Sequence, residues 1–392
     1  MTMVKSVLKS WKTKIMTVKV IRAILIALLA LFLRTYLARI GLIEHDEHQY
    51  AKVAVDYSLA IRTGHWDQIL TYSLNAEHPI FNKLLYAVAL LPFKPIIGGN
   101  GMVYNFPLNK LPYYHQLLAM RLVSVTAGTI ITFILSLINP LAGLAFAVDT
   151  FAIKYSSVIY LEAFPLLASL VALLAAEKAF KNSENGKGHK FRWLILSSVA
   201  MGMAIASKYM YGVVGLAIPV GLLIKRSNRN LKSLSWMAGW GLLCIFFFFL
   251  FDPFLWLSPI SRLQWSIMYF FNYPSSPYVI SKAYPIWQPL IWLLLSIPNQ
   301  YQEFAFSIQA GDYFVLGDTL IFILAVVGIP DLCKKNILMA CWLLLGIIFL
   351  LFWGTKWPQY VMLVLPPLCL SAAFGANIFK DLYFRVMRLM RD

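Results

Sequence analysis

The sequence predicts an all-α polytopic membrane protein, and three observations carry this prediction. Of its 392 residues, 60% are hydrophobic and only 13% are charged, whereas a soluble domain is about half apolar and about a quarter charged. Apolar runs long enough to cross a bilayer recur along the whole chain. Lys and Arg residues gather between these runs. Together these features favour one bundle of about ten transmembrane helices.

Ten apolar runs are predicted to cross the membrane. They are Val20–Ile43, Leu117–Ile138, Pro140–Tyr155, Val158–Phe180, Trp193–Ser207, Tyr209–Ile224, Leu234–Phe251, Phe314–Pro330, Ile337–Trp353 and Gln359–Phe379. Two further runs, Ile80–Ile97 and Ile286–Pro298, are interrupted by Pro or flanked by Trp, so we expect interfacial helices there. Residues 1–392 then form one integral membrane domain with outer loops at 41–116 and 252–313 and no separate soluble domain.

The basic residues fix an expected orientation. The formal net charge is +17, and 21 of the 34 basic residues lie in five stretches between or beside the apolar runs. This positive-inside bias places both termini in the cytoplasm. Binding of nucleic acid is disfavoured, because the basic tails are better explained by anionic lipid headgroups. Val20–Ile43 is read as an anchor, since it is long enough to span and no small-residue cleavage pattern follows it. The four cysteines have no paired spacing and are read as small apolar residues.

The most informative segment follows the first apolar run. Residues 44–50 place three carboxylates and two histidines at the mouth of a membrane helix. Charges there are unfavourable unless they serve an ion, a proton or a substrate. The acids also oppose the dipole at that helix end. Asp46 and Glu47 are therefore candidate catalytic residues.

Other unusual polar residues fall on the same, outer side of the expected topology. They are Glu77, His78, Lys83, Arg121, Glu162, Lys208, Asp252, Lys356 and Tyr360. Lys and Arg neutralise phosphate oxygens, and a carboxylate accepts or orients the proton of a hydroxyl or amine. The combination at a membrane surface suits group transfer from an anionic lipid-linked leaving group.

Each candidate also has a structural interpretation. Asp46 and Glu47 suit a solvated helix end, and Lys208 suits a boundary lysine that snorkels to the headgroups. Asp149 and Lys154 are expected to form a local ion pair. For the whole protein, the alternatives are a transporter or flippase of a lipid-linked or anionic substrate, or a non-catalytic membrane subunit. Carriers usually show internal repeats, and we find none in this sequence.

Several motifs resemble those of a known superfamily. Asp46-Glu47 resembles the Asp-Glu motif of protein O-mannosyltransferases, and the run from Glu77-His78-Pro79 to Lys83 resembles their His-Pro-Pro-Leu-Gly-Lys run. Arg121-Leu122-Val123-Ser124 resembles their Arg-Leu-x-Ser helix opening. Ser207-Lys208-Tyr209 resembles a short Lys turn found there and in lipid A aminoarabinose transferases, and Gln359-Tyr360 through Pro366-Pro367 resembles their final helix. The chain thus resembles the GT-C superfamily of polyprenyl-phosphate-sugar-dependent glycosyltransferases.

The resemblance implies a transferase that moves a sugar from a polyprenyl-phosphate donor, with inversion, to an acceptor hydroxyl or amine on a protein, glycan or lipid. The reaction would take place on the non-cytoplasmic face of the cell membrane. The implied roles are catalysis by Asp46, Glu47 and Glu162, donor-phosphate binding by Lys208, Arg121 and Lys83, and substrate shaping by His78, Glu77, Lys356 and Tyr360.

The sequence departs from the family pattern at three points. Ile80 replaces the second Pro of the His-Pro-Pro run. The second acidic position is Glu162, where the family usually has Asp, and the preceding Arg is absent from Tyr155-Ser156-Ser157-Val158. No Asp-x-Asp motif is present, so we assign no cofactor and no metal ligand, and a divalent metal has no clear motif behind it.

Overall fold

The computed structural model describes residues 2–94, 114–181, 190–224, 231–282, 284–296 and 308–389. Two segments of the sequence lie outside these ranges: the Gly-rich residues 98–101, and the polar residues 182–188, which we expect to form a linker. Every regular element within them is helical. The α-helices are α1 (Thr2–Ile40), α2 (Glu47–Thr63), α3 (Trp66–Leu70), α4 (Phe81–Leu90), α5 (Tyr114–Ile138), α6 (Pro140–Val148), α7 (Thr150–Tyr155), α8 (Ala163–Lys181), α9 (Lys190–Ser207), α10 (Gly212–Ile224), α11 (Leu231–Phe251), α12 (Pro259–Asn272), α13 (Pro277–Ser281), α14 (Gln288–Leu295), α15 (Ile308–Lys335), α16 (Ile337–Phe352) and α17 (Leu365–Leu389). Short 3-10 helices are η3 (Tyr209–Tyr211), η5 (Pro253–Leu255), η6 (Tyr273–Ser275) and η8 (Pro358–Val364).

The membrane-protein prediction is confirmed. Among the described residues, six helical segments are long and apolar enough to cross a bilayer, and each coincides with a predicted span. They are Thr17–Ile40, Tyr114–Ile138, Ala163–Phe180, Ser233–Phe251, Leu316–Lys335 and Pro358–Arg385. Three more predicted spans form shorter apolar helices, at Phe191–Ser207, Tyr209–Ile224 and Ile337–Phe352.

The remaining predicted span, Pro140–Tyr155, is not one continuous helix. It is divided into α6, of nine residues, and α7, of six. A nine-residue helix is about 14 Å long, less than half of a hydrocarbon core of about 30 Å. Asp149 forms the break: it ends α6 in an extended conformation, and its side chain accepts a hydrogen bond from the Ala152 N–H at 2.8 Å, which caps α7.

Buried polar groups satisfy the backbone at this break. Arg34 of α1 is fully buried and donates to the carbonyls of Phe146 and Ala147 at 2.9 and 3.2 Å. Asp318 of α15 accepts from the Thr150 N–H at 3.1 Å. A non-helical backbone inside a membrane protein needs such partners, because hydrocarbon offers none.

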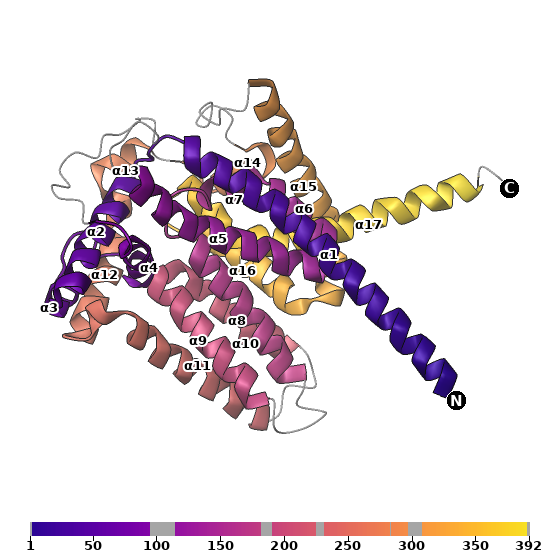
Figure 1. The fold of residues 1–392 in the computed structure, drawn as a ribbon, viewed down its shortest axis with the longest axis horizontal. Helices are drawn as coiled ribbons and strands as arrows, with labels where there is room; N and C mark the ends of the chain where they lie inside the picture. The colour runs from indigo at the N-terminus through magenta and orange to yellow at the C-terminus, as the bar shows by residue number, and fades with distance from the viewer. Residues whose placement is uncertain are drawn as a thin grey trace.

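The helices formed within the two predicted outer loops gather at one end of the bundle. Figure 1 shows α2, α3, α4, α12 and α13 at the end of the molecule opposite both termini. The predicted interfacial runs form α4, of ten residues, and α14, of eight, both too short to cross. The amphipathic helix α12 was not foreseen. This end of the bundle carries the predicted site residues.

Close contacts between small residues tie α15 to α17, which pack against each other. A Cβ added at Gly328 would lie 1.9 Å from the Ser371 carbonyl oxygen, and one at Gly375 would lie 2.0 Å from that of Leu324. Such small-residue contacts are the usual means by which membrane helices approach closely. These contacts fix α17, which follows the segment that contains Tyr360, against α15.

Candidate active site

Asp46 lies between the end of α1 and the start of α2. It is half-buried and occupies the N-cap position of α2 without a side-chain capping bond. Within the described chain, its carboxylate makes no hydrogen bond. Burial raises the pKa of Asp46, while the positive charges of His45 and Lys208 act in the opposite direction. An unengaged carboxylate with a raised pKa is suited to accept a proton.

Lys208 and Glu162 form a buried ion pair beside Asp46. The Lys208 ammonium donates to Glu162 Oε1, and both side chains are almost fully buried. The same ammonium lies 5.0 Å from the ring centroid of Tyr360, in a cation–π contact. Glu162 Oε2 has no hydrogen-bond partner among the described residues. The structure therefore brings four predicted residues, Asp46, Glu162, Lys208 and Tyr360, into one cluster.

Aromatic rings of the outer elements line this cluster. Tyr50 of α2 lies near both Asp46 and Glu162 and contacts the Tyr160 ring edge-on at 5.9 Å. His78 lies between Tyr50 and Phe270, with ring centroids 6.2 and 5.3 Å away. Burial, and then the charges of Lys208 and Lys83, hold the pKa of His78 well below its usual value. His78 is therefore neutral, and its buried Nδ1 has no partner in the described chain.

Glu47 and Arg121 are engaged with each other and with the backbone. The Arg121 Nε and Nη2 groups donate to the two Glu47 oxygens, each at 2.6 Å. The remaining Arg121 donors bond to the carbonyls of Ala38, Gly41 and Leu42, at the end of α1, at 2.8–3.0 Å. All five N–H groups of the guanidinium are thereby used. The pair joins α1, α2 and α5, and Arg121 has no donor left for a phosphate.

Lys83 has a similar structural task. It is fully buried in α4, and its three donors bond to the Asn75 carbonyl, the Asn75 Oδ1 and the His78 carbonyl at 2.7, 3.2 and 3.0 Å. Glu77 accepts from the Asn75 Nδ2 at 2.9 Å in the same loop. Lys83 thus holds the turn that presents His78. We therefore revise the sequence-based assignment of Arg121 and Lys83 to the donor phosphate.

One sequence interpretation is corrected by the observed contacts. Lys154 pairs with Glu44 at 2.7 Å rather than with Asp149, because Asp149 turns back to cap α7. Asp252 lies at the turn between α11 and η5 and is fully buried. It lies near Lys83 and the backbone N–H groups of Ile80 and Phe254, and burial raises the pKa of Asp252 to about 7.

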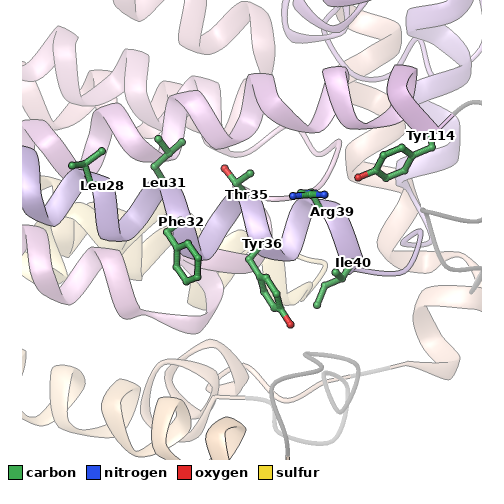
Figure 2. Close-up of a pocket in the computed structure, with 8 residues that line it drawn as sticks. All are labelled: Leu28, Leu31, Phe32, Thr35, Tyr36, Arg39, Ile40 and Tyr114. Carbon is green, nitrogen blue, oxygen red and sulfur yellow. The ribbon is translucent and has the colours of Figure 1, made fainter.

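Lys356 does not join the Lys208 cluster. Its ammonium donates to the Trp353 carbonyl, and the side chain lines a cavity of about 160 Å³ between the second outer loop and the segment before η8. A larger groove of about 630 Å³ runs along the exposed apolar face of α1, from Leu28 to Ile40, and ends at Tyr114. Figure 2 shows its lining, with Arg39 near the Tyr114 end. None of the predicted site residues lines that groove.

The described residues contain no group of three or more His, Cys, Asp or Glu side chains able to hold a metal ion. What the cluster offers is a carboxylate, a buried cation held by a second carboxylate, and aromatic walls. This set supports acid–base chemistry and stabilisation of a negative charge.

No family model and no curated protein matches the chain. Its fold, however, is similar to ArnT from Cupriavidus metallidurans. The crystal structure bound to undecaprenyl phosphate aligns with a TM-score of 0.62 at 14% identity, over 91% of this chain and 60% of ArnT. The apo structure aligns at 0.61 and 15%, over 92% and 60%. The S. cerevisiae Pmt1-Pmt2 complex bound to the sugar donor aligns at 0.45 and 20%, over 62% and 34%.

The class of fold follows from the ArnT alignments. This chain shares the fold of ArnT, a likeness in keeping with the resemblance drawn from the sequence motifs. It spans about 60% of the length of ArnT.

Proposed function

We propose that this protein is a membrane glycosyltransferase that moves a sugar from a polyprenyl-phosphate donor to an acceptor hydroxyl or amine. The observation that carries the proposal is the cluster of Asp46, Lys208 and Glu162, which occupies one end of a bundle with the ArnT fold. ArnT holds undecaprenyl phosphate in its crystal structure, which supports a lipid-linked donor here.

The cluster supports a single displacement. Asp46 takes the proton of the acceptor as the acceptor oxygen or nitrogen attacks the anomeric carbon of the donor. The bond from that carbon to the phosphate oxygen breaks, and the electron pair leaves with the phosphate. Lys208 stabilises the developing charge with the donors that Glu162 does not use, which is electrostatic catalysis. Attack opposite the phosphate inverts the anomeric centre.

The assay that tests this proposal uses purified protein in lipid nanodiscs and a panel of radiolabelled polyprenyl-phosphate sugars. Release of polyprenyl phosphate with at least one donor supports the transferase. If no donor on a broad panel is cleaved, with or without added acceptors, the proposal fails.

One observation favours the transporter or flippase alternative. The break between α6 and α7, with buried Arg34, Asp149 and Asp318, resembles the discontinuous helices of carriers. The nanodisc assay separates the two functions, because a flippase moves the lipid without breaking the sugar–phosphate bond.

A matched pair of variants tests Lys208 as the phosphate ligand. We expect Lys208→Gln to weaken binding of a polyprenyl-phosphate donor by about tenfold or more, the loss of one charge-assisted bond. Glu162→Gln keeps the cation and should leave donor binding equal or tighter. The measurement is donor affinity in nanodiscs. Equal weakening by both variants would mean that the ion pair acts only on structure.

Orientation is a second expectation of this proposal, with the site on the non-cytoplasmic face and both termini in the cytoplasm. In a background with Cys333 replaced by Ser, Thr71→Cys at the site end should react with an impermeant thiol reagent added to intact cells. Phe191→Cys, at the start of α9, should react only after permeabilisation. Labelling of both positions in intact cells would contradict the assigned topology.

A further inference from the structure

The cavity beside Lys356 is built from two segments that are far apart in the sequence. Pro274, Lys282 and Tyr284 come from the second outer loop, and Gly354, Lys356 and Trp357 come from the segment between α16 and η8. A Cβ added at Gly354 would lie 2.5 Å from the Pro274 Cγ. The Tyr278 and Trp357 rings stack with centroids 5.9 Å apart. These contacts lock the two segments together, so the cavity is a fixed feature.

The charge of this cavity is positive. Lys282 and Lys356 both line it, and its lining contains no carboxylate among the described residues. Burial lowers the pKa of Lys356, and no neighbouring acid opposes this shift. Within the described ranges, neither lysine forms an ion pair. The Lys356 ammonium spends one of its three donors on the Trp353 carbonyl, which leaves donors for an anion.

The cavity is a neighbour of the proposed catalytic cluster. Lys356 precedes by four residues the Tyr360 whose ring contacts Lys208. Tyr273, adjacent to the lining residue Pro274, lies within electrostatic range of Asp46. The described lining residues lie outside the membrane-spanning helices. The cavity is therefore formed by the connecting segments and not by the spans.

We propose that this cavity binds a phosphate or carboxylate carried by the acceptor, so that the enzyme selects anionic acceptors. The proposal rests on the proposed transferase function and adds the acceptor class to it. Lys282 and Lys356 supply the charge, and the Trp357 and Tyr284 rings supply apolar walls for the rest of the acceptor. A volume of about 160 Å³ admits one small group and not an extended chain.

Binding measured without transfer tests the cavity separately from the reaction. Protein in nanodiscs is titrated calorimetrically with inorganic phosphate, with methyl glucuronide as the carboxylate probe, and with methyl glucoside as the neutral one. We expect at least one anionic probe to bind, and its affinity to fall about tenfold or more in the Lys282→Gln/Lys356→Gln variant. Lys52→Gln, at a half-buried lysine paired with Asp56 at the same end, should bind as wild type does. Which anion binds identifies phosphate or carboxylate as the selected group.

The outcomes separate the two proposals. Absence of binding by both anions, or equal binding by wild type and the double variant, overturns the acceptor site whether or not donors are cleaved. Lysine-dependent binding supports it. Failure of the transferase proposal appears only in the donor-cleavage assay, which is run on the wild-type protein. A loss of polyprenyl-phosphate donor binding in the double variant would place the lysines in the donor site and overturn the acceptor assignment.

Discussion

Replacement of Asp46 by Asn is expected to reduce sugar transfer about 10²–10⁴-fold, the usual contribution of a general base. Asn has nearly the same shape but cannot accept the acceptor proton. Because the Asp46 carboxylate makes no hydrogen bond in the described chain, the substitution should leave the fold and donor affinity unchanged. The measurement is the turnover rate with a saturating donor, together with donor affinity.

The control for this prediction is Asp67→Asn, at an exposed acid on α3 at the same end, which should retain full turnover. Near wild-type turnover in Asp46→Asn would remove Asp46 from catalysis and make Glu162 the candidate.

The pH dependence of the turnover rate gives a further test of Asp46. Asp46 must be ionised to act, and burial raises its pKa. Activity should therefore be lost as the pH falls, with the midpoint of that loss above the ordinary Asp pKa of about 3.9. Since Lys208 lowers that pKa, Lys208→Gln should move the acid limb to higher pH.

Removal of the Arg121 side chain is expected to have the largest effect on stability. Arg121→Leu leaves the Glu47 carboxylate buried without its partner and three carbonyls at the end of α1 without donors. Breaking a buried ion pair from one side usually costs about 3–5 kcal/mol. We expect a marked fall in folded yield and in the thermal unfolding midpoint of detergent-solubilised protein.

Two variants sharpen this experiment. Arg39→Leu removes an exposed arginine from the same region of the chain and should leave the unfolding midpoint unchanged. Glu47→Leu combined with Arg121→Leu should recover part of the loss, because an apolar pair of similar volume is often tolerated where a single buried charge is not. An Arg121→Leu protein with the wild-type midpoint but weaker donor affinity would restore the phosphate role given to Arg121 by its motif.

The membrane fold was readable from the sequence because its signal is simple. Hydrophobic runs of the required length mark helices irrespective of their partners, and six of the predicted spans are long helices in the structure. The same criterion misjudged Pro140–Tyr155. Its composition is apolar apart from Asp149, Thr150, Lys154 and Tyr155, and only the contacts from Arg34 and Asp318 show why the helix can end there.

The sequence proposes site residues by their type, but the roles proposed for them depend on geometry that a sequence does not contain. The three residues of the cluster converge in space although the first, Asp46, and the last, Lys208, are 162 positions apart in the sequence, with Glu162 between them. Arg121 looked equally suited to a phosphate, and only its five hydrogen bonds reveal a different task. Tyr50 and Tyr160 were missed because aromatic residues in outer loops are also expected in an interfacial belt. Their sequence positions relative to the acidic residues did not indicate that they line the site.

Arg34 has a consequence for the order of events during synthesis. An arginine deep in a membrane helix disfavours insertion by about 2.5–3.5 kcal/mol. The carbonyl that Arg34 meets at 2.9 Å belongs to Phe146, 112 residues later in the chain. The first helix is therefore synthesised before the carbonyls of Phe146 and Ala147 that Arg34 contacts in the folded protein, and within α1 Arg34 bonds only to the Ala30 carbonyl, at 3.4 Å. Insertion of the amino-terminal helix is completed by a segment synthesised well after it.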